Sequence, residues 1–118
     1  MQYLLLIYRN EEAWLGMSEG ERDKMFTDYG AFTQSIAQSG HYKGGNPLQG
    51  TKTATTVRVR DGKRTMTDGP FAETREHLCG YYLVEAKDLD DAISLAERVP
   101  GARVGSIEVR PIMATSAM

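Results

Sequence analysis

The sequence predicts an α+β domain of the ferredoxin-like type, in which an antiparallel sheet carries two helices on one face. Three observations lead to this prediction. Two segments repeat apolar residues at helical spacing, several shorter segments have the pattern of strands bounded by turns, and their order is strand, helix, hairpin, central strand, helix, strand. With right-handed crossovers, the ferredoxin-like topology is the simplest one that fits this order. The chain of 118 residues fits one domain, expected over residues 1–113, with residues 114–118 frayed.

The first predicted elements are a buried strand and a long helix. Residues 3–8 are apolar without alternation, which is typical of a strand that is buried on both faces. Residues 10–16 are expected to form a connection. Ser18 and Glu21 then have the spacing of a capping box, and the apolar residues that follow recur every three or four positions. This pattern predicts a helix over residues 19–39, which Gly40 ends.

The middle of the chain predicts a hairpin. Residues 41–52 are rich in glycine and are expected to be a short extended piece that passes into a loop; they lack the Gly-Lys-Ser/Thr of a phosphate-binding loop. Residues 53–60 and 63–67 flank Asp61-Gly62, a favoured two-residue hairpin turn. Asp68-Gly69-Pro70 must end the return strand, because proline has no N–H to donate.

The last third of the chain predicts a central strand, a helix and an edge strand. Residues 77–86 form the second nearly continuous apolar run, which favours a central position in the sheet. Asp88 is a suitable N-cap for a helix that ends before Pro100. Residues 105–111 alternate apolar and polar side chains, as a strand with one buried face does.

The two continuous apolar strands predict a homodimer. Two helices cover only one face of the sheet, yet residues 3–8 and 78–86 are apolar on both faces. A second copy that packs sheet against sheet would cover the other face with a self-complementary patch. We therefore expect a dimeric α/β barrel.

Composition excludes several kinds of partner. With 14 basic and 16 acidic residues the net charge is −2, so we expect neither nucleic acid nor a membrane surface to be bound. No run approaches the roughly 20 apolar residues that cross a bilayer. The single cysteine, Cys79, suits a reducing compartment, and we expect a cytoplasmic protein.

One stretch carries a family resemblance. Residues 65–76 contain Asp68-Gly69-Pro70-Phe71 and resemble the signature of the DGPF family, a branch of the YCII-related proteins. The resemblance implies a bacterial protein with a dimeric α/β barrel fold, and it implies an association with sigma factors of the extracytoplasmic-function class. In similar proteins a helical histidine and an aspartate are proposed as an acid–base pair. Here the matching helical position falls at or near Tyr29, so that pair is not carried over.

The signature supplies the candidate catalytic residues, Asp68 and Glu73. A carboxylate beside a Gly-Pro turn and under Phe71 would have a raised pKa if it were partly desolvated, which suits acid–base chemistry. The alternative is structural, because an aspartate before glycine often caps a turn through its own backbone. The candidate ligand-binding residues are Tyr29, His41, Arg58, Asp68, Phe71 and His77.

Two further sets of residues have a structural alternative. His77 and Cys79 lie on one face of a strand, but a metal site needs at least three ligands, so we expect no metal and no cofactor. Arg58 and Arg60, with Glu108 and Arg110, would line a cavity for a carboxylate or phosphate if they faced the space between two sheets. If they faced water, they would be ordinary exterior residues of strands.

Three function classes remain open at this stage. The first is a homodimeric protein that binds a small molecule or regulates transcription with a sigma factor. The second is a small-molecule enzyme that uses Asp68 or Glu73 in a cleft of the dimer. In the third, the signature has a purely architectural role and sets the turn that leads into the central strand.

Overall fold

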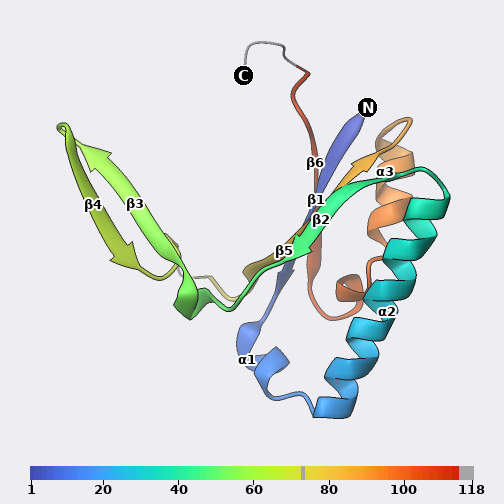
Figure 1. Cartoon of the computed structure of the whole chain (residues 1–118), viewed down its shortest axis with the longest axis horizontal. Helices are drawn as coiled ribbons and strands as arrows, with labels where there is room; N and C mark the ends of the chain where they lie inside the picture. Colours follow the sequence, from blue (N-terminus) through green and yellow to red (C-terminus); the bar gives the residue numbers. More distant parts are fainter. Residues whose placement is uncertain (73, 115–118) are drawn as a thin grey trace.

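A computed structural model of the chain describes residues 1–72 and 74–114 (Figure 1). The strands are β1 Gln2–Arg9, β2 Tyr42–Pro47, β3 Thr55–Arg60, β4 Lys63–Asp68, β5 His77–Glu85 and β6 Ser106–Pro111. The α-helices are α1 Glu11–Leu15, α2 Glu19–Gln38 and α3 Leu89–Ala96, and two 3₁₀ turns are η1 Thr51–Thr53 and η2 Pro100–Arg103. The expected fraying of residues 114–118 concerns a tail of which all but Ala114 lies outside the described residues.

The main sheet has the ferredoxin-like arrangement that the sequence predicts. Its strand order is β2-β5-β1-β6, and every neighbouring pair is antiparallel. β5, the second apolar run, lies between β2 and β1 as expected for a central strand. Helices α2 and α3 stand on one face of this sheet (Figure 1). The fold is therefore α+β, with two helices over a four-stranded antiparallel sheet.

The core lies between that face and the two helices. Alternate residues of β1 and β5 turn toward the helices, as the two-residue period of a strand requires. Phe32 of α2 packs edge to face on Tyr82 of β5, with 5.3 Å between the ring centroids. The buried side chains from these four elements include Tyr3, Leu5, Ile7, Phe32, Ile36, Tyr82, Val84, Ala92 and Leu95, and Val99, just before η2, joins them.

None of the described helices covers the opposite face of the sheet (Figure 1). Leu4 and Leu6 of β1 lie opposite Leu83 and Tyr81 of β5, and all four side chains are only partly buried. This face is why the two strands are apolar without alternation: one set of side chains is in the core and the other is on the open face.

The hairpin differs from the expectation that it belongs to the main sheet. β3 and β4 form a separate two-stranded sheet that projects from the body of the molecule (Figure 1). The reason is that β2, from the glycine-rich segment, pairs with one side of β5 while β1 pairs with the other, so the hairpin has no place beside β5. Val57 and Met66, which pair across the hairpin, are 55% and 61% exposed.

The signature turn ends the hairpin as its composition requires. Gly69 has a φ of +94°, a conformation that L-residues with a side chain rarely adopt. Its N–H donates to the carbonyl of Ala54 at 2.7 Å, and the hydroxyl of Thr56 donates to its carbonyl at 2.8 Å. The chain therefore leaves β4 through a turn fixed to the start of β3.

The expected connection over residues 10–16 is wrong, because it contains a helix. The Asn10 carboxamide accepts a hydrogen bond from the N–H of Ala13 at 2.9 Å and so caps α1. The capping box at Ser18 and Glu21 is confirmed, with both hydrogen bonds at 3.1 Å, and it begins α2 at the predicted residue. In the part of the chain that the structure describes, no helix is long and apolar enough to span a membrane.

Candidate functional site

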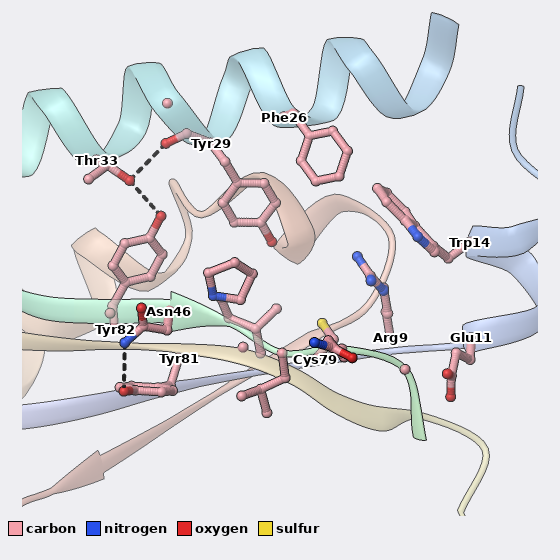
Figure 2. Close-up of a pocket in the computed structure, with 18 of the residues that line it drawn as sticks. Arg9, Glu11, Trp14, Phe26, Tyr29, Thr33, Asn46, Cys79, Tyr81 and Tyr82 are labelled. Atoms are coloured by element: carbon pink, nitrogen blue, oxygen red, sulfur yellow. Dashed lines mark hydrogen bonds between the residues drawn. The ribbon is translucent and has the colours of Figure 1, made fainter. Parts of the chain in front are cut away.

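A cleft of about 630 Å³ opens between α1, the N-terminal half of α2 and the sheet (Figure 2). This volume lies in the range of small-ligand sites. Most of its lining is apolar, and three of its large side chains remain substantially exposed: Leu15 at 69%, Phe26 at 59% and Leu48 at 42%. Large apolar side chains grouped around a cleft indicate a surface that has a partner.

Helix α1 closes one end of the cleft. Trp14 meets Phe26 of α2 edge to face, with 5.5 Å between the ring centroids. The guanidinium carbon of Arg9 lies 3.9 Å from the centroid of the Trp14 ring, a favourable cation–π distance. Figure 2 shows these three side chains together at the end of the cleft beneath α2.

Tyr29 projects from α2 toward the sheet and brings a hydroxyl to the cleft (Figure 2). This hydroxyl accepts a hydrogen bond from the N–H of Gly101 at 3.1 Å. A Cβ at position 101 would lie 2.5 Å from the Tyr29 oxygen, so the contact requires glycine there. Burial raises the pKa of Tyr29 to about 12. Tyr29 therefore stays protonated near neutral pH, and its own O–H hydrogen is available to an acceptor in the cleft.

Thr33 and Tyr82 form a second polar group in the cleft, but its hydrogens are already used. The Thr33 hydroxyl donates to the carbonyl of Tyr29 at 2.9 Å and lies 2.7 Å from the Tyr82 hydroxyl. Because Thr33 has a single hydroxyl hydrogen, Tyr82 must be the donor of the second bond. The hydrogen bond between Thr33 and Tyr82 fixes the Tyr82 ring. A ligand could therefore only donate a hydrogen bond to these hydroxyl oxygens, because both hydroxyl hydrogens are in use.

Cys79 lies at an irregularity in β5. The β1–β5 register passes from Ile7↔Gly80 to Tyr8↔Leu78, which leaves Cys79 as the extra residue of a bulge. Its side chain lines the cleft, and burial raises the pKa of its thiol. The protonated thiol is a weak nucleophile, so the residue contributes apolar contact surface.

Glu11 ties the segment after β2 to α1. Its carboxylate accepts hydrogen bonds from the Thr51 N–H at 2.8 Å and the Thr51 hydroxyl at 2.6 Å. These two bonds hold the pKa of Glu11 below its usual value, and the charges of His77 and Arg9 lower the pKa less. The Nδ1 atom of His77 is 3.8 Å from Oε2 of Glu11, the oxygen that accepts from the Thr51 hydroxyl. The contact keeps residues 48–51 beside the cleft.

The structure gathers few of the predicted ligand residues in this cleft. Tyr29 lines it. His77 lies beside the Glu11 carboxylate. His41 follows the C-terminal end of α2, where its Nδ1 is 2.6 Å from the Ser39 hydroxyl and its Nε2 is 3.3 Å from the Asp91 carboxylate. His77 and Cys79 gain no third partner: within residues 1–72 and 74–114, no three His, Cys, Asp or Glu side chains cluster closely enough to hold a metal.

The remaining predicted site residues belong to the hairpin and the turn that follows it. Arg58 and Asp68 are exposed on β3 and β4, and Phe71 is 78% exposed. None of the three lines the cleft. Glu73, the other candidate acid or base, lies outside the described residues. The arginines of the hairpin and the Glu108 and Arg110 pair stand on two different sheets and do not form a common cavity.

Sequence reasoning missed the residues that close the cleft, above all Arg9 and Trp14. The signal for α1 was available: Asn10 is a good N-cap, and Glu11 and Glu12 place negative charge in the first turn. A helix there would have put Trp14 opposite the apolar face of α2.

The family comparison agrees with the fold. A model of the YCII-related domain matches residues 1–116. The chain belongs to the YCII-related family. It is also 34% identical over 114 residues to an uncharacterized protein of Rhizobium meliloti (strain 1021), a match that covers 95% of this chain and 92% of the relative.

Replacing Glu11 with glutamine tests its role as a link. We expect E11Q to lower the free energy of unfolding by about 1 kcal/mol near pH 7, because charge-assisted hydrogen bonds from Thr51 are lost. Since the folded pKa of Glu11 is depressed, its contribution is complete above the unfolded value of about 4.3 and declines as pH falls through the folded value.

Urea unfolding at neutral and acidic pH measures this effect. The difference between E11Q and the wild type should shrink in acid, whereas the matched change E12Q, at an exposed neighbour, should have little effect at either pH. An E11Q effect that is equal at both pH values would contradict the assignment.

Proposed function

We propose that this YCII-related protein is a homodimer that binds a small, largely apolar molecule in the cleft between α1, α2 and the sheet. The observation that carries the proposal is the cleft itself, with its volume of about 630 Å³ and the exposed rings and aliphatic side chains around it. Hydrogen bonds fix several of its polar side chains, among them Tyr29, Thr33 and Tyr82, as expected of groups that orient a ligand.

The chemistry of the lining favours binding over turnover. Burial raises the pKa values of both Tyr29 and Cys79, so neither is a good base or nucleophile near neutral pH. Glu11 is held by Thr51. An acid–base role for Asp68 would require the substrate to react at the exposed end of β4 instead of in this cleft.

Filling the cleft tests the ligand site. Gly30 of α2 lines the cleft, and a Cβ at this position meets no atom within 4 Å. G30L should therefore fold, with a small gain in helix stability, and it should occlude the cleft. The matched control is G20L, because Gly20 lies on the same helix, has equally open surroundings and is not part of the lining.

Trp14 is the only tryptophan and lines the cleft, so its indole N–H NMR signal reports occupancy. We expect a saturable shift of this signal with small aromatic compounds in the wild type and G20L, and none in G30L. Equal titration of G30L and the wild type would show that the compounds bind elsewhere.

The open face of the sheet supports the homodimer. Leu4, Leu6 and Tyr81 form a partly buried apolar surface, and Glu108 and Arg110 of β6 flank it with opposite charges. A two-fold contact would cover the apolar side chains and could pair each acid with the base of the other copy.

A lysine on this face should separate the copies. We expect the wild type to sediment at twice the 13.1 kDa mass of the chain, and L6K to sediment as a folded monomer, because an unpaired charge would be buried in the contact. The control I93K changes a residue that is 46% exposed on α3 and should remain dimeric. A monomeric wild type at micromolar concentration would refute the dimer.

The sigma-factor partner implied by the family resemblance is part of the proposal and is tested separately. Co-purification with an extracytoplasmic-function sigma factor should recover a complex. If neither protein is recovered with the other, the sigma factor is not a partner. The proposal that the cleft binds a small molecule would be unaffected by that result.

A further inference from the structure

Arg9 lines the largely apolar cleft, and among the described residues it forms no ion pair. Its Nε atom is buried and has no hydrogen-bond partner among the residues that the structure describes. None of the ion pairs within 4.0 Å between these residues involves Arg9. The contact with the Trp14 ring leaves the guanidinium N–H groups directed to the cleft (Figure 2). The side chain as a whole is only partly buried, but a buried N–H without a hydrogen bond is costly, so a bound acceptor at Nε is expected.

Glu11 also lines the cleft but forms no ion pair with Arg9. Glu11 follows Arg9 closely in the sequence, but its carboxylate faces Thr51 and His77. The pKa of Glu11 is lowered first by the hydrogen bonds from Thr51, and Arg9 is the weakest of the influences on it. Figure 2 shows the Glu11 carboxylate directed away from the space beneath Phe26, whereas the Arg9 guanidinium points into it.

The second available group in the cleft is also a donor. The Tyr29 oxygen already accepts from Gly101, so its hydrogen is the part that remains for a ligand. Arg9 and Tyr29 both line this cleft, and Figure 2 shows both side chains in the space beneath α2. The Tyr82 hydroxyl hydrogen, in contrast, is used by Thr33.

We propose that the ligand is a small monocarboxylate with an aromatic or other apolar body, whose carboxylate pairs with Arg9 and accepts a hydrogen bond from Tyr29. The body would lie against Trp14 and Phe26. One cation and one neutral donor match a single negative charge, and a planar guanidinium matches a carboxylate through forked hydrogen bonds. A phosphate dianion would bring a second charge toward Glu11, for which the described lining has no second cation.

This inference rests on the proposed ligand site, and two isosteric probes separate the two claims. Naphthalene-2-carboxylate and naphthalene-2-carboxamide have nearly the same shape and differ in charge. We expect the wild-type protein to bind the carboxylate at least about tenfold more tightly than the amide, measured by the Trp14 indole signal.

Variants of Arg9 then test whether this residue causes the preference for the carboxylate. R9Q should remove most of the tenfold preference for the carboxylate over the amide, and R9K should keep part of that preference because the charge remains without the fork. Y29F should weaken carboxylate binding about fivefold. The matched control is R98Q, since Arg98 also packs over an aromatic ring, Phe32, at 5.7 Å, but is exposed outside the cleft.

Each outcome decides one claim. If neither probe shifts the Trp14 signal, the proposed ligand site fails. If both probes bind the wild type equally, the ligand site stands and the carboxylate inference is overturned. This comparison uses only the wild-type protein, so it does not depend on whether a variant folds. A preference that persists undiminished in folded R9Q would also overturn it.

Discussion

The difference in length between α2 and α3, the two helices that cover the sheet, decides where this protein can bind a ligand. α3 has 8 residues and lies over one end of the sheet, whereas α2 has 20 residues and extends well past it (Figure 1). The C-terminal half of α2 buries Phe32 and Ile36 in the core. Among the described residues no second long helix lies beside its N-terminal half, and α1 and the segment after β2 close the space there. The cleft exists because these short pieces cover the apolar face of α2 incompletely.

Two small contacts hold those pieces in place and give the cleft its chemical character. The Glu11 carboxylate fixes Thr51, and the Arg9 guanidinium stacks on Trp14. Because Glu11 is used for the link, the positive charge of Arg9 is left for the interior of the cleft. Raised pKa values keep Tyr29 and Cys79 protonated, so the lining offers donors and apolar surface and little reactivity. This is the physical basis for preferring binding to catalysis.

The fold was largely predictable because its signals are local. The capping box at Ser18, the cap at Asp88 and the apolar run of β5 each specify an element within a few residues. The position of the hairpin was not, since an alternating strand does not indicate which sheet it joins. The site was missed for a related reason. The family signature drew attention to Asp68, but the cleft combines residues from β1, α1, α2, β2 and β5, and only the packing of α1 on α2 brings them together.

The central claim is that this cleft, and not the signature turn, receives the ligand. The most direct measurement is a crystal structure of the protein with naphthalene-2-carboxylate. The account predicts density for the ring system beside Trp14 and Phe26, with carboxylate oxygens about 2.8 Å from guanidinium nitrogens of Arg9. Density at Asp68 or on the open face of the sheet, with the cleft empty, would contradict it.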